Sequence, residues 1–256
     1  ESSIIEQKTI TVEGKILSDP GFIDNRVVSE FVTQIYNGSE NLYRTVEKIF
    51  YGVLVSEFLT KIGKTGNKQD YKGLNIFYDT TVLMRLLGTS GKYLQIATQE
   101  MHGVLQDLGC NTYYFNHTYA ELVAALEHVV EAYNNNGNIF TETKKALEEG
   151  ETSISTITRI LSDPDTPLGK LNIVEHPVAY EERDRDEFQI DEKEFENELV
   201  RTGRFRKNTL APEYDSKSLA LVQRIREGVN TNSVSECKEI LVTHNTLLAS
   251  RAKRFL

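Results

Sequence analysis

Short apolar runs that each lead directly into a helix-like stretch constrain the fold more than any other feature. Residues 74–78, 112–115 and 239–242 have the composition of short buried strands. Apolar residues at helical spacing follow each run, beginning at about residues 81, 118 and 247. Strands that alternate with helices build parallel sheets with helices packed against them. The sequence therefore predicts an α/β fold with a mainly parallel central sheet.

Three acidic residues stand at the junctions of this pattern. Asp79 directly follows the first run, Glu121 lies one turn inside the helix after the second run, and Asp215 begins a helix just after Pro212. The carboxyl ends of parallel strands share one crevice, so acids delivered there can converge on one divalent cation. We expect Mg²⁺ or Mn²⁺ at this site, and hence metal-dependent phosphodiester hydrolysis.

Each acidic residue also has a purely structural explanation. Asp79 stands where the N-cap of the following helix is expected, and Asp215 is placed in the same way before its own helix. Thr118 and Glu121 have the spacing of a capping box, in which both side chains bond to backbone N–H groups of the first turn. The individual residues leave both explanations open, and only their order favours the metal site.

The order of these residues resembles that of PIN-like nuclease domains. In that family a strand ends in Asp, a helix carries Glu, a further helix begins with Asp, and a strand ends in Thr-x-Asp or Thr-x-Asn. Here the last element is matched by Thr243 and Asn245, which follow the strand at 239–242. The matched blocks are residues 74–126 and 212–255, and the β-α-α-β-α order of the first block is that of the family.

The resemblance implies a three-layer α/β/α fold and a metal-dependent endonuclease. Asp79, Glu121 and Asp215 would hold the metal, Asn245 would orient a water, and hydrogen bonds from Thr81 and Thr243 would position the carboxylates. The family favours RNA over DNA as the substrate. On the same ground we expect the chain to be the effector part of a larger bacterial toxin or antiviral-defence protein.

Two features favour an alternative function. Asn245 stands at the family's fourth acidic position, where it supplies an oxygen but no charge, and a net charge of −9 opposes the binding of nucleic acid. The alternative is a catalytically inactive PIN-like module that binds a protein or nucleic-acid partner. A haloacid-dehalogenase-like phosphatase matches less well, because its second aspartate would fall at Thr81.

The rest of the chain predicts two regions and an insertion. Residues 1–70 form an irregular and helical N-terminal region, and residues 71–256 form the PIN-like domain with an insertion at about 135–210. We expect helices near 141–149 and 154–161 in the insertion, and a solvated acidic face at 181–199 rather than a second metal site. The chain lacks a starting Met and the family's final strand, so we expect it to be part of a larger protein, with other domains or subunits as partners.

Basic and sulfur-containing residues suggest partners and a compartment. The basic cluster Arg201, Arg204, Arg206 and Lys207 shortly precedes the helix of Asp215 and could guide a phosphate backbone to the site; the alternative is a solvated loop that pairs with the acidic run. Two cysteines without CxxC spacing indicate buried thiols in a reducing compartment, the cytoplasm. The apolar stretch at 49–59 is too short to cross a bilayer, so we expect no membrane segment.

Overall fold

The computed structural model describes residues 71–178, 180, 186–202, 211–231 and 234–255. The chain divides into two compact units, Glu1–Ser56 and Glu57–Leu256, and every described residue belongs to the second unit. The N-terminal region predicted over residues 1–70 therefore lies outside the described residues.

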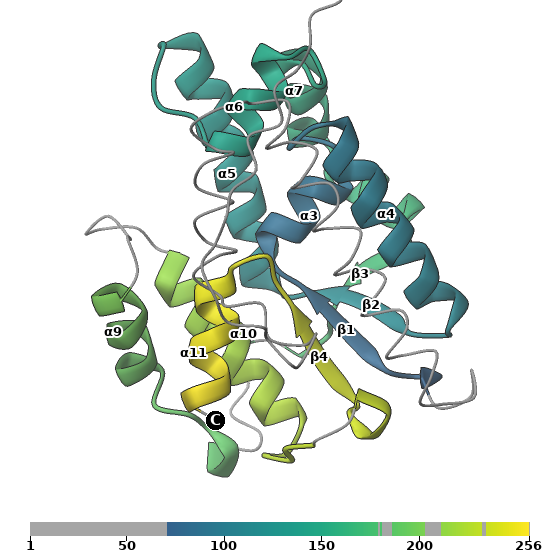
Figure 1. Cartoon of the computed structure of the whole chain (residues 1–256), viewed down its shortest axis with the longest axis vertical. Coiled ribbons are helices and arrows are strands. Elements are labelled where there is room, and N and C mark those ends of the chain that lie inside the picture. Colours follow the sequence, from purple (N-terminus) through teal and green to yellow (C-terminus); the bar gives the residue numbers. More distant parts are fainter. Residues whose placement is uncertain (1–70, 179, 181–185, 203–210, 232–233, 256) are drawn as a thin grey trace, which may run out of the picture. The chain divides into compact units, whose positions relative to one another are not determined.

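A four-stranded parallel sheet forms the centre of the second unit (Figure 1). Its order is β3-β2-β1-β4, and all three neighbouring pairs run parallel. The strands are β1 (Asn75–Tyr78), β2 (Asn111–Tyr114), β3 (Ile173–Glu175) and β4 (Glu239–Val242). The chain moves outward from β1 through β2 to β3 and then crosses to the other side of β1, so the strand order reverses between β1 and β4. The predicted α/β fold with a parallel sheet is confirmed.

Helices cover both faces of this sheet. Figure 1 shows α3, α4 and α5 on one side of the strands and α9, α10 and α11 on the other. The first group, with its connections, comprises α3 (Thr80–Leu86), α4 (Lys92–Asp107), α5 (Asn116–Asn134), α6 (Thr141–Glu148), α7 (Ile154–Ser162) and α8 (Asp165–Lys170). The second comprises α9 (Glu192–Thr202), α10 (Ala211–Ile225) and α11 (Thr246–Phe255), with short 3₁₀ turns at Asp186–Phe188 and Val234–Glu236.

Alternation along β1 supplies the core of both layers. Ile76 and Tyr78 point into a cluster with apolar side chains of α3, α4, α5 and α7, whereas Phe77 faces the opposite layer and packs with Leu221 and Val222 of α10. These three β1 side chains are almost fully buried, and such burial stabilises a fold by about 1.5–3 kcal/mol per large apolar residue. The two layers of helices around one sheet are compatible with a three-layer α/β/α fold.

The observed elements follow the sequence pattern closely, with additions in the predicted insertion. The helices expected from about residue 81 and near 141–149 and 154–161 are present as α3, α6 and α7, and the strand expected at 239–242 is β4. Helix α4 is the second helix of the expected β-α-α-β-α order. Missing from the expectation were α8 and β3, which lie within 135–210; β3 pairs with β2 and extends the sheet. A strand of three residues with one buried side chain carries too little periodicity to be recognised in the sequence.

Two further expectations concern the membrane and the thiols. None of the helices in the described part of the chain has both the length and the apolar character needed to span a membrane. Cys110 and Cys237 are free thiols, but they are partly rather than fully buried, because each stands before a strand at the edge of the core rather than inside it.

Candidate active site

A cavity of about 390 Å³ opens where the carboxyl ends of β1 and β4 meet, at the reversal of the strand order. Open α/β sheets bind their ligands at this point, because the loops on the two sides diverge there and leave a crevice. The three predicted carboxylates all line the cavity. The other polar lining residues are Thr80, Thr81, Arg85, Ser90, Thr141, Glu142, Thr143, His244 and Asn245.

Asp79 both caps a helix and lines the cavity. It directly follows β1, and its Oδ1 accepts hydrogen bonds from the backbone N–H of Val82 at 2.8 Å and from Thr81 Oγ1 at 2.8 Å. Its Oδ2 accepts one from Thr243 Oγ1, at the end of β4. Burial raises the pKa of Asp79, and the hydrogen bonds from Thr243, Val82 and Thr81 oppose that rise. The N-cap explanation is therefore confirmed, and the expected hydrogen bonds from Thr81 and Thr243 are present.

Glu121 is held by a hydrogen bond from α3 and not by a cap on its own helix. Helix α5 begins at Asn116 with Phe115 as its N-cap and has no side-chain cap, so the predicted capping box of Thr118 and Glu121 is wrong. Glu121 Oε2 instead accepts a hydrogen bond from Thr80 Oγ1 on α3. Burial, and next the negative charge of Asp79, raise the pKa of Glu121 to about 7.

Asp215 lies inside α10 and not at its start. The helix begins at Ala211 with Pro212 in its first turn, a position where proline loses no hydrogen bond, so the predicted N-cap role of Asp215 is wrong. Its Oδ2 accepts a hydrogen bond from Asn245 Nδ2 at 3.0 Å. Burial and the charges of Glu121 and Asp79 raise the pKa of Asp215 to about 8, and the Asn245 hydrogen bond opposes the rise.

Asn245 uses both ends of its amide. Its Oδ1 accepts from the backbone N–H of Leu248 at 3.1 Å and thereby caps α11, while its Nδ2 donates to Asp215. Its own backbone N–H donates to Thr243 Oγ1 at 2.8 Å. An aspartate at this position could cap the helix equally well, but it could not donate to Asp215 and would add a fourth negative charge. Asparagine therefore favours the ionised form of Asp215.

The donor chemistry of the site fits a divalent cation. Three carboxylates from separate elements line one cavity, and mutual repulsion contributes to the raised pKa values of Glu121 and Asp215. Among the described residues, Glu121 Oε1 and Asp215 Oδ1 accept no hydrogen bond. No group of three or more His, Cys, Asp or Glu in that part of the chain is placed to hold a metal ion as it stands. Binding of one ion by all three carboxylates thus requires their side chains to turn.

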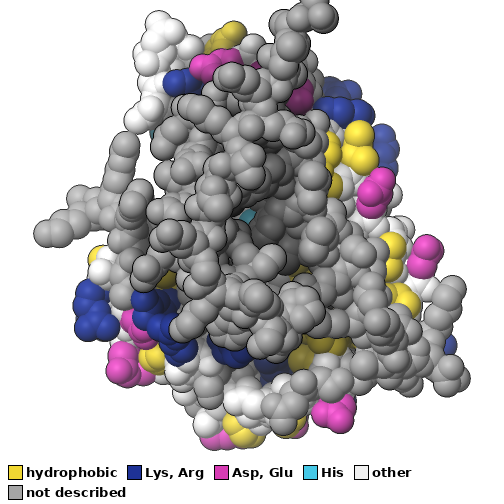
Figure 2. Space-filling view, in the orientation of Figure 1, with side chains coloured by type: hydrophobic (Ala, Val, Ile, Leu, Met, Phe, Trp, Pro, Cys, Tyr) yellow, Lys and Arg dark blue, Asp and Glu magenta, His cyan; other side chains and the backbone are white. Residues whose placement is uncertain are grey.

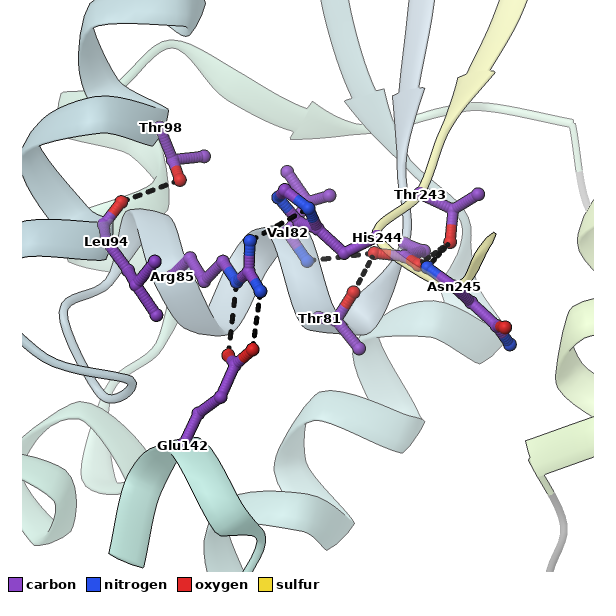
Figure 3. Close-up of polar contacts among 10 residues, drawn as sticks. Thr81, Val82, Arg85, Leu94, Thr98, Glu142, Thr243, His244 and Asn245 are labelled. Atoms are coloured by element: carbon purple, nitrogen blue, oxygen red, sulfur yellow. Dashed lines mark hydrogen bonds and ion pairs between the residues drawn. The ribbon is translucent and has the colours of Figure 1, made fainter. Parts of the chain in front are cut away.

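Three ionisable residues that line the cavity, Arg85, Glu142 and His244, had no role in the sequence-based prediction. Arg85 on α3 is 4% exposed and forms a two-bond ion pair with Glu142 on α6, with Nε–Oε2 at 3.1 Å and Nη2–Oε1 at 2.5 Å (Figure 3). Its Nη1 also lies 2.8 Å from His244 Nδ1. Burial and the charge of Arg85 lower the pKa of His244 to about 4, so this histidine is neutral and accepts the bond. The available signal was an arginine inside the apolar run 82–87.

The predicted basic cluster does not line the cavity within the described residues. Arg201 is an exposed residue near the end of α9, and Arg204, Arg206 and Lys207 lie outside the described residues. Figure 2 shows dark-blue Lys and Arg side chains at the lower left of the face, over the region of α9 and α11 in Figure 1. The last turn of α11 contributes Lys253 and Arg254 to the exposed surface.

Comparisons with protein-family models, curated proteins and solved structures gave no match to this chain. The resemblance to PIN-like nucleases is therefore carried by the order of residues in the chain, and the chemistry of the site is argued from its own side chains.

Proposed function

We propose that the protein is a PIN-like, metal-dependent nuclease that hydrolyses phosphodiester bonds, with RNA preferred over DNA. One observation carries the proposal: Asp79, Glu121 and Asp215, from three separate elements, line a single cavity at the reversal of the strand order. Acidic residues far apart in the sequence have no structural need to share a cavity, because their repulsion costs stability there. Such a cost is typical of a site that serves function.

The chain's own residues would prepare the site for Mg²⁺ or Mn²⁺. Thr81 and Thr243 hold Asp79 from both of its oxygens, and Asn245 holds one oxygen of Asp215. The free oxygens of Asp215 and Glu121 then remain for the ion or for a water. When bound, the ion would lower the pKa of a bound water and offset negative charge on the phosphoryl group.

Other surfaces support a nucleic-acid substrate. Phe140 lines the cavity with half of its side chain exposed, and an exposed ring at the rim can stack on a base. Arg201, Lys253 and Arg254 are exposed on α9 and α11 and could contact the backbone of a longer strand. The free thiols of Cys110 and Cys237 agree with a reducing compartment, and we propose the cytoplasm.

A second candidate is a catalytically inactive PIN-like module that binds a partner. It is favoured by the hydrogen bonds that already occupy both oxygens of Asp79, and by the absence, within the described residues, of a ready-made group of metal ligands. The amide of Asn245 at the family's fourth acidic position supports the same candidate, because it removes one charge from the site.

The test is cleavage of end-labelled single-stranded RNA and DNA by the purified chain with Mg²⁺ or Mn²⁺. The Asp79→Asn and Asp215→Asn variants each remove one charge from the cavity and preserve side-chain shape. Asp107→Asn, an exposed carboxylate on α4, is the matched control. Cleavage by wild type and control, with loss in both cavity variants, supports the nuclease. Equal cleavage by all four proteins, or by none, refutes it, and the second outcome favours the inactive module.

A further inference from the structure

Arg85 is a buried cation in a cavity lined by carboxylates. Its side chain is 5% exposed, and it is the only Lys or Arg among the described residues that line the cavity. A buried guanidinium is costly unless its donors are paired. Here a carboxylate on a different helix, Glu142, supplies the two-bond contact (Figure 3).

The two partners are held very differently. Arg85 lies in the last turn of α3, which packs against the sheet, and its side chain has almost no access to solvent. The Glu142 side chain is 45% exposed and extends from the first turn of α6, of which only Thr143 and Ala146 are buried. Glu142 can therefore leave the contact and be solvated at low cost, whereas Arg85 remains in place, held also by His244, and can bind another anion on the side that Glu142 leaves.

A phosphate group has the geometry to replace Glu142. Arginine binds carboxylate and phosphate through the same fork, with two parallel N–H···O bonds. A further donor lines the same cavity: Thr143 follows Glu142 on α6, is 1% exposed, and its Oγ1 has no hydrogen-bond partner among the described residues. A buried hydroxyl without a partner is unfavourable, and a bound oxyanion would satisfy it.

We propose that Arg85 is a phosphate-binding residue of the cavity, that Thr143 assists it, and that Glu142 is an internal carboxylate that occupies Arg85 until a substrate phosphate displaces it. The inference rests on the proposed function, because it takes the substrate to be a nucleic acid. It adds a built-in competitor: substrate binding must break the Arg85–Glu142 contact, so the Glu142 side chain acts as a gate at the cavity.

The test measures the affinity of a fluorescein-labelled, 12-nucleotide single-stranded RNA by anisotropy, in EDTA to prevent metal-dependent cleavage. Glu142→Gln removes the competing charge and should tighten binding by about tenfold, the size of one charge-assisted hydrogen bond. Glu148→Gln is the matched control, because it makes the same change of charge at an exposed ion pair with Lys144 on the same helix, outside the cavity lining. The control should change the affinity by less than about twofold.

Arg85 variants make the test specific. Arg85→Gln should weaken RNA binding and abolish the gain in affinity from Glu142→Gln. It should also make the slope of log K against log salt concentration shallower by about 0.7, the value for one lost phosphate contact on a single strand. If Arg85→Gln does not fold, Arg85→Lys serves instead, since it retains the charge but loses the fork and should lose most of the gain. An equal gain from Glu142→Gln and Glu148→Gln, or a gain that persists without Arg85, overturns the inference.

These outcomes separate the inference from the proposed nuclease function. If Glu142→Gln tightens RNA binding only when Arg85 is present, and RNA is not cleaved when metal is added, the phosphate site is supported and the nuclease function is refuted. If RNA is cleaved in the presence of metal but Glu142→Gln changes RNA affinity no more than the control does, the nuclease function is supported and the role of Glu142 as a gate is refuted. Absence of RNA binding in every protein overturns the inference as well.

Discussion

Replacement of Asp215 by Asn should stabilise the metal-free protein at alkaline pH. Burial and the charges of Glu121 and Asp79 raise the pKa of Asp215 from 3.8 to about 8. A raised pKa means that the folded state binds a proton that the unfolded state has released. This contribution to stability is complete below the unfolded pKa and is lost as pH rises through the folded pKa. Wild type should therefore lose stability between about pH 4 and pH 8.

The magnitude follows from the same pKa values. A rise from 3.8 to about 8 corresponds to roughly 6 kcal/mol between the two protonation states. The three carboxylates titrate together, so part of this free energy belongs to Glu121 and Asp79, which can hold the proton instead. We therefore expect Asp215→Asn to change the free energy of unfolding by on the order of 2 kcal/mol. For a domain of this size that is about 4–8 °C in Tm. The amide of the variant can still accept the Asn245 hydrogen bond.

The assay is denaturant and thermal unfolding in EDTA from pH 5 to pH 9. We expect Asp215→Asn to exceed wild type at pH 8 and to show a flatter dependence on pH, while the exposed control Asp107→Asn behaves like wild type. Added Mn²⁺ should stabilise wild type more than the variant. A variant less stable than wild type at pH 8, or a wild type whose stability does not change between pH 5 and pH 8, would refute the idea that repulsion and burial strain this site.

Three further outcomes are expected. Saturating Mn²⁺ should stabilise wild type by about 2.7 kcal/mol at one hundred times its Kd, and melting curves should show no such gain for Asp79→Asn. Thr243→Val should lower the free energy of unfolding by about 1–3 kcal/mol, because it removes the hydrogen bonds with Asp79 and the Asn245 backbone N–H. Thr246→Val, at an exposed position, is the control, and an equal loss of stability in both variants would contradict this prediction. Phe140→Ala should weaken anisotropy-measured binding of single-stranded RNA by about 1–2 kcal/mol, whereas Tyr133→Ala, an equally exposed aromatic residue outside the cavity lining, should not.

Elements with strong local signals could be predicted from the sequence. The strand at 239–242 and the helices after Asp79 and Gly91 combine apolar periodicity with a cap or a glycine at the junction. These signals depend on neighbouring residues alone, so the parallel α/β arrangement follows from them. The short strand β3 has one buried residue, and it forms because the exposed edge of β2 offers backbone partners, which no local pattern reveals.

The candidate site was predictable in its three carboxylates, in Asn245 and in the hydrogen bonds from Thr81 and Thr243, but not in its other contacts. Asp79 and Asn245 were expected from their positions after strands, and both line the cavity. The helix of Asp215 begins earlier than expected, because Pro212 favours the first turn and does not end the preceding segment. Arg85 was not predicted as a site residue. Its position within an apolar helical run was the available signal, because a buried arginine almost always has a charged partner.

The sequence by itself determined the strand-helix alternation, the position of Asp79 at a strand-helix junction and the acidic charge of the chain. Only the tertiary structure decided which side chains meet: Thr243 reaches Asp79 across 164 residues, Thr80 reaches Glu121 across 41, and Arg85 meets Glu142 across 57. Local propensity acts over a few neighbours, whereas these contacts arise when sheet pairing and helix packing bring distant segments together. The same packing buries the carboxylates, and that burial shifts their pKa values.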